Sequence, residues 1–409
     1  MRLVIFGVGA NWKVIKDYID ICEHEIVAFL DNYYKGEVKW GDKGVVEVIS
    51  PGDFFADKVM YDVILITGIH YKDIKEQLIG KYRVSVNQIA CVEEECPLSK
   101  QIIKAAYFKE KKRDRDLERI KRDQRNSLHL QAKLLINNLA QKDNIDSIHE
   151  VEFRVNSQWG EDGIIQWLIH HIPIKNKTFI EFGVENYEEA NTRFLLENDN
   201  WSGMIMDGSS DNIDYVKRSE LYWRYDLCAI DAFITKENIN QLLRSSGFDE
   251  DLGLLSVDID GNDFWVLKEI NCMKPRILIC EYNSIYGEKE KVTIPYKADF
   301  YRTEAHYSNL YFGASLEAIK LLAGEKGYTF VGANSNGCNA FFVRNDLANF
   351  LPEKMLLNAG YVLSKFRESR NKNGELTYMS HNKAKKVIGE MDVFDITTET
   401  IKKIHNLEK

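Results

Sequence analysis

The stretch LLSVDIDGNDFW, residues 254–265, contains an apolar strand pattern that ends in three aspartates around a glycine turn. Residues two apart on a strand share a face, so Asp258 and Asp260 would project together wherever the strand stays regular. Like charges this close raise one another's pKa unless a cation, a set of donors or a polyhydroxyl ligand compensates. A structural alternative is that Asn262 or Asp263 caps the helix FWVLKEI that follows. Capping leaves Asp258 and Asp260 unexplained, so the stretch indicates a binding or catalytic site.

Length and composition favour a globular protein with more than one domain. The 409 residues are enough for two or three domains, and 44% hydrophobic residues can form substantial cores. The sequence has no run of about 18 apolar residues, and its start, MRLVIFGVGANWK, lacks a signal-peptide pattern. We therefore expect a cytoplasmic protein without a membrane span. The net charge of −9 disfavours nucleic-acid binding and favours a small-molecule substrate.

The cysteines give no sign of a disulfide framework. They are odd in number and lack a CxxC pair, which also argues against a zinc knuckle. We expect reduced, mostly buried thiols. They are Cys22, Cys91, Cys96, Cys228, Cys272, Cys280 and Cys338.

Alternating strand and helix patterns predict an α/β protein with two Rossmann-like doubly wound domains. Residues 1–98 contain patterns of βαβ units, including a helix predicted over 14–21. Residues 150–350 repeat the alternation and end in GYTFVGAN and NAFFVR, which predict a late antiparallel hairpin. The charged residues 351–409 predict a helical extension.

Residues 99–149 predict a helical linker between the two domains. The segment 100–144 has no glycine or proline, and acids are interleaved with its basic run KEKKRDRDLERIKRDQR. A solvated helix face therefore explains this run better than a polyanion-binding surface. Its leucines and isoleucines do not keep a clean heptad, so we expect an interdomain or dimer-forming helix and a homodimer.

Polar residues follow the predicted strands of the second domain. Ligands of open parallel sheets bind at the carboxyl ends of the strands, near the point at which strand order reverses. TFIEFG supplies Glu181 and then Gly183, where a turn lets backbone approach a ligand. WSGMIMDG supplies Asp207, placed to accept hydrogen bonds from ribose hydroxyls, and RILICEYN supplies Glu281 and Asn283 on one face.

The stretches SQWGEDGII (157–165), EFG (181–183) and NTR (191–193) resemble motifs of class I S-adenosylmethionine-dependent methyltransferases, particularly the FkbM-like group, over roughly 151–344. The resemblance implies a class I methyltransferase sheet with S-adenosylmethionine as cofactor. We expect methyl transfer to a sugar hydroxyl of a nucleotide-linked or glycan precursor in bacterial surface-polysaccharide biosynthesis. The loop EFGVENY departs from the family pattern, because it has one glycine where two or three are usual. The cofactor-binding residues that we expect are Glu161, Asp162, Glu181, Gly183, Asn191, Asp207 and Asp231.

Two catalytic routes stay open for a hydroxyl acceptor, whose proton must be removed. If the fourth and fifth strands are neighbours, as the resemblance implies, Asp258 or Asp260 with Glu281 and Asn283 would form an oxygen-ligand set for Mg²⁺ or Ca²⁺. Such a metal could hold a vicinal diol and lower its pKa. The metal-free route uses one carboxylate or His306 as general base, or lets the acids bind substrate hydroxyls by hydrogen bonds.

The stretches YFGASL (311–316) and SNGCNAFFVR (335–344) also resemble the group and suggest an acceptor pocket. Alternatively, Asn339 caps a turn and Arg344 pairs with Asp346 on the surface. The arginines of FRESR, 366–370, could contact a phosphate of an activated sugar, or lie on a solvated charged face. The substrate-binding residues that we expect are Asn262, Asp263, Asn283, Gly313, Asn339 and Arg344.

The first domain has the elements of a dinucleotide-binding fingerprint. VIFGVGANW places Gly7 and Gly9 after a strand, and Asp31 follows about 20 residues on. Trp12 occupies the third glycine position, which counts against NAD binding. The domain resembles the small Rossmann-like module of bacterial sugar-nucleotide acyltransferases, which implies a nucleotide-sugar or pyrophosphate site at Gly7, Gly9 and Asp31, with Thr67, Gly68 and His70.

Other functions stay open beside methyl transfer. The N-terminal module could be purely structural. The whole chain could be an NAD(P)-dependent sugar-nucleotide oxidoreductase or epimerase, or a non-catalytic nucleotide-sugar-binding scaffold. The YxxxK pair expected of short-chain oxidoreductases is absent, which counts against the first of these two.

Overall fold

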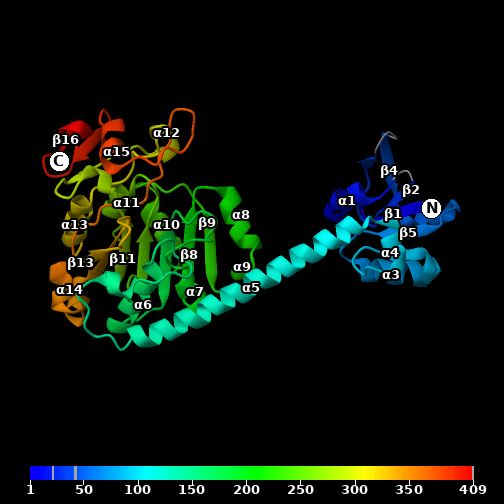
Figure 1. Ribbon diagram of the computed structural model, residues 1–409, viewed down its shortest axis with the longest axis horizontal. Coiled ribbons are helices and arrows are strands. Elements are labelled where there is room, and N and C mark those ends of the chain that lie inside the picture. The colour runs from blue at the N-terminus through cyan, green and yellow to red at the C-terminus, as the bar shows by residue number, and fades with distance from the viewer. Residues whose placement is uncertain (21–22, 41–43, 408–409) are drawn as a thin grey trace. The chain divides into compact units, whose positions relative to one another are not determined.

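Two separate sheets carry the fold, and the strands of each are mostly parallel, as the alternating patterns predict. A computed structural model describes residues 1–20, 23–40 and 44–407. It divides into two units, Met1–Arg125 and Asn126–Lys409, each with its own hydrophobic cores (Figure 1). The α/β fold class with two doubly wound sheets is therefore confirmed.

The sheet of the first unit has the order β3-β4-β2-β1-β5-β6, and only β3 is antiparallel to its neighbour. Apolar side chains cover both faces of its central strands, as is typical of parallel sheets. The strands are β1 (Arg2–Phe6), β2 (Glu25–Leu30), β3 (Glu37–Lys39), β4 (Val45–Ile49), β5 (Val63–Ile66) and β6 (Ile89–Cys91), and the helices are α1 (Ala10–Ile15), α2 (Pro51–Ala56), α3 (Tyr71–Gly80) and α4 (Pro97–Ile102).

The helix predicted over residues 14–21 begins earlier than expected. It is α1, followed by a 3-10 turn over Lys16–Tyr18, while Ile21 lies outside the described residues. Trp12 of this helix packs edge-to-face on Phe29, with ring centroids 5.1 Å apart. Trp12, at the third glycine position, is therefore a core residue. Its side chain fills the space between helix and sheet that a glycine would close.

The predicted linker is one helix of 35 residues, α5 (Ala105–Leu139). Its first turns belong to the N-terminal unit, where Lys111 pairs with Glu93 at 2.6 Å. Its last turns belong to the second unit, where Ala132 and Ile136 pack against Phe194. Dimer formation through this helix stays a prediction.

The sheet of the second unit has the order β13-β14-β11-β10-β7-β8-β9. Strand β14 is antiparallel to both its neighbours, so the late hairpin is confirmed. The chain leaves β7 toward β8 and β9 on one side and returns to β10 and β11 on the other, which creates a switch point between β7 and β10. The strands are β7 (Thr178–Phe182), β8 (Ser202–Asp207), β9 (Leu227–Asp231), β10 (Leu254–Val257), β11 (Ile277–Glu281), β13 (Tyr328–Ala333) and β14 (Asn339–Arg344).

Helices cover both faces of this sheet, with a buried cluster beneath each layer. The strand runs are apolar at nearly every position because both of their faces are covered. The helices are α6 (Glu161–His171), α7 (Arg193–Asp199), α8 (Ser210–Arg218), α9 (Glu220–Arg224), α10 (Ile239–Ser245), α11 (Asp263–Glu269), α12 (Arg302–Ala305) and α13 (Leu316–Glu325).

The prediction of a helical C-terminal extension is wrong in part. In its described part, up to residue 407, the helical elements are α14 (Glu353–Asn358), α15 (His381–Val387) and a 3-10 turn over Ile404–Asn406, and the last strands form a small sheet with β12. Burial alternates with a period of two around Val393 and Asp395, which suits a strand and not a helix. This segment lies over one end of the large sheet (Figure 1). The small sheet consists of β12 (Val292–Thr293), β15 (Asp392–Asp395) and β16 (Thr400–Lys403).

The cysteines are less buried than we expected. Of the six in the described part of the chain, only Cys91 and Cys280 are buried, and none forms a disulfide. Cys228 is exposed because it lies on the edge strand β9. Cys22 lies outside the described residues. No helix in the described ranges is long and apolar enough to cross a membrane.

Candidate active site

A cavity of about 610 Å³ opens at the carboxyl ends of β7, β10 and β11, beside the switch point. Its wall includes the loops after these strands, Arg302 and Phe312, and the C-terminal residues 363–368, 379–381 and 384. Small-molecule sites commonly have volumes of roughly 300 to 1,000 Å³. The cavity therefore has the place and the size of a ligand site.

Three acids meet in this cavity. Strands β10 and β11 pair with Val257 opposite Cys280, so the next residues, Asp258 and Glu281, leave the sheet side by side. Asp260 has a φ of +53°, so the strand is not regular to this point; the turn brings its carboxylate back toward the pair. Carboxylate oxygens of Asp258, Asp260 and Glu281 lie within 4.8 Å of one another. The sequence therefore predicted the cluster correctly, although not the turn that completes it.

Burial and mutual repulsion shape the chemistry of this cluster. Burial raises the pKa of Asp258 well above its usual range, and the charges of Asp260 and Asp263 add to the effect. The pKa of Glu281 is likewise raised well above its usual range by burial and then by Asp258 and Asp260. Two carboxylates this close do not both ionise easily without a cation. Ionisation of one acid therefore opposes ionisation of the other.

Arg302 of α12 supplies a positive charge that the sequence analysis missed. Its guanidinium forms an ion pair with Asp260, while its Nε donates to the carbonyl oxygen of Asn309 at 2.8 Å. The guanidinium carbon lies 3.8 Å from the centre of the Phe312 ring. Three acids at strand ends predicted a nearby cation. The sequence contains many arginines, however, and no pattern identified Arg302 as the one that would pair with them.

Two oxygen atoms in the cavity wall lack a donor. Oε2 of Glu281 and Oδ1 of Asn339 are buried, and neither receives a hydrogen bond from an N–H or hydroxyl among the described residues. The two residues face each other across β11 and β14. A buried acceptor without a donor is costly, so this corner of the cavity suits a ligand with hydroxyl or amine protons.

Glu181 and Gly183 form the other side of the cavity. The Glu181 carboxylate accepts hydrogen bonds from the backbone N–H groups of Asn191 at 2.8 Å and Thr192 at 3.0 Å. Burial raises the pKa of Glu181 to about 7. Gly183 has a φ of +67°, and a Cβ there would lie 1.7 Å from the carbonyl oxygen of Asp258. This glycine is therefore required by the contact between the loops after β7 and β10.

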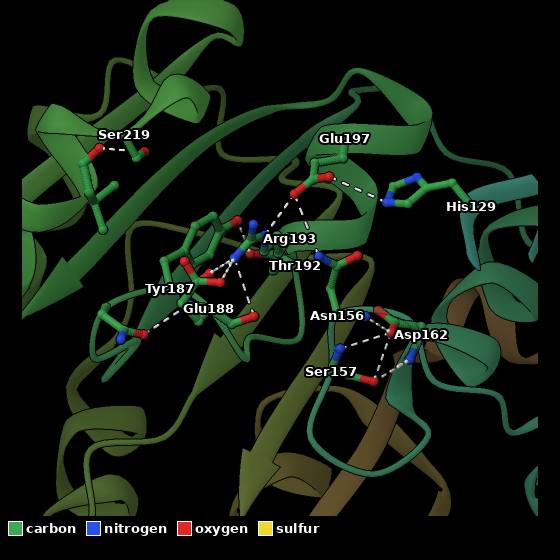
Figure 2. A network of polar contacts seen from close by, with 12 residues as sticks. His129, Asn156, Ser157, Asp162, Tyr187, Glu188, Thr192, Arg193, Glu197 and Ser219 are labelled. Carbon is green, nitrogen blue, oxygen red and sulfur yellow. Dashed lines mark hydrogen bonds and ion pairs between the residues drawn. The ribbon is translucent and has the colours of Figure 1, made fainter. Parts of the chain in front are cut away.

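A buried arginine holds the loop between Gly183 and α7, as Figure 2 shows. Arg193 is 2% exposed and pairs with Glu197 at 2.7 Å and Glu188 at 3.1 Å. Its Nη1 also donates to the carbonyl oxygen of Tyr187 at 2.8 Å. Arg193 of the NTR stretch thus stabilises the loop that forms part of the cavity wall.

We expect Arg193→Met to lower the free energy of unfolding by about 3 to 5 kcal/mol, because it removes the guanidinium from a buried ion pair with Glu197 and from the carbonyl oxygen of Tyr187. Urea denaturation followed by circular dichroism measures the loss. Arg218→Met is the control, since Arg218 pairs with Asp214 on the exposed surface of α8. A loss as small as that of the control would show that the network is not needed for folding.

Several predicted cofactor residues bind the chain itself. The Asp162 carboxylate accepts from the backbone N–H groups of Val155, Asn156 and Ser157. Glu161 accepts from Asn339 Nδ2 at 3.0 Å, among other donors. Both carboxylates are fully buried beside the cavity wall and outside its lining. They act as supports for the site and not as cofactor contacts.

Asp207 and Asp231 end neighbouring strands and face each other in the register of β8 and β9. The Asp207 carboxylate accepts from the N–H groups of Glu185 at 2.8 Å and Ser209 at 2.8 Å, and from Asn212 Nδ2 at 3.2 Å. A carboxylate can accept about four hydrogen bonds, so one site remains for a ribose hydroxyl. Asp231 is exposed, and both residues lie outside the cavity lining.

The predicted helix cap after the acidic turn has a different role. Oδ1 of Asp263 accepts from the N–H of Ile259 at 2.8 Å and Oδ2 from that of Gly261 at 2.9 Å, so Asp263 fixes the turn and does not cap α11. Asn262 is the residue at the cap position, but its side chain donates to the carbonyl oxygen of Lys297. Both are buried outside the cavity lining.

Asn283 lines the cavity, but its amide is engaged. It accepts from the N–H of Ile285 and donates to the carbonyl oxygens of Leu310 and Phe312. Gly313 follows this segment, outside the cavity lining, and its N–H donates to the carbonyl oxygen of Gly261. The residues predicted to bind substrate here instead shape the wall.

His306 and Arg344 are corrections to the predicted site. Nδ1 of His306 lies 2.7 Å from Oγ of Ser308, and the ring is outside the cavity lining, so it does not serve as the general base. Arg344 pairs with Asp346 and Asp251. Strand β14 begins at Asn339, which lines the cavity, and ends at Arg344. The six residues of this strand place Arg344 at the end of the strands that lies away from the cavity.

The glycine turn of the N-terminal unit is explained by local structure. Gly7 has a φ of +101°, and a Cβ there would meet the backbone of Gly68 at 2.9 Å. The Asp31 carboxylate accepts from the N–H groups of Val8, Tyr33 and Tyr34. These contacts serve the loops of the unit itself. A nucleotide-sugar site at Gly7, Gly9 and Asp31 stays a prediction.

Comparisons with known proteins bring no family assignment. No family model and no curated protein matches this chain. Many solved structures are similar over part of it. One is the N-terminal domain of EvdMO1 with S-adenosylhomocysteine bound, which is 8% identical to this chain, with a TM-score of 0.31. The similarity covers 46% of this chain and 82% of that domain. The CurJ carbon methyltransferase is 13% identical over 44% of this chain and 52% of its own, with a TM-score of 0.29.

An O-methyltransferase from Bacillus cereus in complex with S-adenosylhomocysteine is 13% identical. It covers 41% of this chain and 72% of its own, with a TM-score of 0.26. Likenesses of this size do not assign an activity. The activity has to follow from the chemistry of the site.

Proposed function

We propose that this protein is an S-adenosylmethionine-dependent methyltransferase that acts on a hydroxyl group. The observation that carries the proposal is the pair of half-buried carboxyl groups, Asp258 and Glu281, in a cavity at the switch point of the sheet. The sequence patterns predicted a doubly wound sheet with a late antiparallel hairpin, and the second unit has this sheet. The sequence motifs and the cavity are separate observations, and both support the same activity.

The cofactor would lie across the end of β7. Bound S-adenosylmethionine would supply an electrophilic methyl group. Gly183 lets the loops after β7 and β10 approach each other, and the buried Glu181 is part of the cavity lining. Asp207 keeps one acceptor site for a ribose hydroxyl. The residues present therefore fit the cofactor, although the loop has a single glycine.

The acceptor would lie at the end of β11. Because the pKa of Asp258 and of Glu281 is raised, either carboxylate is a stronger base than a free one and suits removal of the proton of an acceptor hydroxyl. Asn339 Oδ1 offers a further acceptor beside them, which suits a substrate with several hydroxyls. This polyhydroxyl character supports a sugar of a nucleotide-linked or glycan precursor.

A divalent cation is a second way to use the same acids. Asp258, Asp260 and Glu281 provide the hard oxygen ligands that Mg²⁺ and Ca²⁺ prefer. The unpartnered Oε2 of Glu281 fits such an ion, whereas the pairing of Arg302 with Asp260 already supplies one positive charge. A bound ion would lower the pKa of an acceptor hydroxyl.

Isothermal titration calorimetry with S-adenosylhomocysteine tests the proposal. We expect binding with a dissociation constant in the micromolar range, at which free energies near −8 kcal/mol are typical. Parallel titrations with NADH and with MgCl₂ separate a nicotinamide enzyme and a metal site from the proposal. Binding of NADH without binding of S-adenosylhomocysteine would contradict it.

A further inference from the structure

A second hollow adjoins the catalytic cavity, and cations line it. Its volume is about 620 Å³, and it shares Arg367, Met379 and Ser380 with the cavity. Lys383 and Lys386 of α15 complete its charged lining. One wall segment of the active site is thus also a wall of this hollow, which we call the basic annex.

The cations of the annex are not used by the fold. Neither Lys383 nor Lys386 has a side-chain hydrogen bond or a carboxylate within 4.0 Å in the described part of the chain. Arg367 uses one nitrogen, Nη2, to donate to the carbonyl oxygen of Tyr378 at 3.0 Å. All three side chains are exposed. Their remaining donors are free to meet a ligand.

Other bases of the same extension are paired. Arg370 lies 2.9 Å from Glu368, Lys402 reaches Asp395 at 2.5 Å, and Lys403 reaches Asp392 at 2.7 Å. A chain of net charge −9 has acids to spare, yet Arg367, Lys383 and Lys386 have none within 4.0 Å among the described residues. Lys383 and Lys386 lie three apart on one helix, where like charges repel. An anion would relieve this repulsion.

We infer that the annex binds the phosphate or diphosphate of the acceptor, so that the substrate is a phosphorylated, hydroxyl-bearing small molecule. An arginine fork and two ammonium groups are the donors that phosphate oxygens take. The acids around Asp258 and Glu281 repel a phosphate and accept hydroxyl protons. The two linings therefore fix the direction of the substrate, with its anionic end in the annex and its hydroxyl end at the acids.

This inference deepens the proposed function and rests on it for the identity of the reaction. The inference that the annex binds an anion depends only on the residues of the annex. The same lysines would also attract anionic lipid headgroups, but the annex shares a wall with the catalytic cavity, which favours a ligand that also reaches this cavity. Membrane attachment is therefore an outcome that the test must separate.

Calorimetry with inorganic pyrophosphate and with glucose 1-phosphate, each in low salt, tests the inference. We expect both to bind the intact chain, and the double variant Lys383→Gln/Lys386→Gln to bind them roughly tenfold to a hundredfold more weakly, because each charge-assisted contact is lost. S-adenosylhomocysteine binding should be unchanged. Lys175→Gln/Lys217→Gln is the matched control, since it removes the same charge from two exposed lysines away from the cavity lining.

Equal weakening in the control, or no binding of either phosphate, would overturn the inference. So would sedimentation with phosphatidylglycerol vesicles that depends on Lys383 and Lys386 while neither phosphate binds. If the phosphates bind through these lysines but S-adenosylhomocysteine does not bind, the annex is retained and the methyltransferase proposal fails. The two conclusions can thus fail separately.

Discussion

Gly183→Ala is expected to lower the free energy of unfolding of the second unit by about 3 to 5 kcal/mol and to remove binding of S-adenosylhomocysteine. The φ of +67° alone costs an alanine about 1 to 2 kcal/mol. The added Cβ would also lie 1.7 Å from the carbonyl oxygen of Asp258, which is backbone and cannot rotate away. The loops after β7 and β10 must then separate, and these loops form the cavity wall.

Urea denaturation measures the first effect and calorimetry the second. Gly324→Ala is the control, because Gly324 lies in α13 with no atom within 4 Å of an added Cβ. Alanine there should stabilise the unit by about 0.5 to 1 kcal/mol, since it is the better helix former. If Gly183→Ala kept wild-type stability and bound the cofactor product, the contact between the two loops would not constrain the site.

Periodicity predicted the fold well where one environment governs a whole element. Runs such as those of β7, β8, β10 and β11 are apolar throughout because both faces of the sheet are covered, and each was assigned from sequence. The helical prediction for residues 351–409 was wrong in part, because charged residues in this segment resemble those of an exposed helix. Its period of two around Val393 depends on pairing with β12, about 100 residues earlier, and sequence reasoning did not include that pairing.

The site was predictable only as far as strand ends determine it. Asp258 and Glu281 meet because successive parallel strands end at one edge, and that rule is general. Arg302 was missed because its place depends on a loop that folds back from a segment without regular structure. Glu161 and Asp162 were misinterpreted for a related reason: a motif shows that acids are required, but not whether they face the ligand or the backbone.

Glu281→Gln is expected to lower methyl transfer by about 10² to 10⁴, the range typical for loss of a general base. Release of S-adenosylhomocysteine with the acceptor measures this effect. The same change should stabilise the fold at alkaline pH. The pKa of Glu281 is raised by burial and by Asp258 and Asp260, so the folded state holds a proton that the unfolded chain would release.

The direction of the pH effect follows from this difference. Below the ordinary pKa of a glutamate, about 4.3, both states are protonated and the raised pKa carries no penalty. As the pH rises from there toward the raised value, the wild type loses stability, because ionisation costs more in the folded state. Each unit of pKa difference corresponds to about 1.4 kcal/mol. Glutamine does not ionise, so the variant avoids this loss.

In metal-free buffer, the variant should therefore be more stable than the wild type at about pH 8 and differ little from it at about pH 4. Urea denaturation at both values tests this, with Glu353→Gln as a control at an exposed acid of α14. Added MgCl₂ should narrow the gap if the three acids bind the ion, because only the wild type has all three ligands. A variant less stable than the wild type at both pH values would mean that Glu281 holds the fold together and that its high pKa is not a feature of a catalytic site.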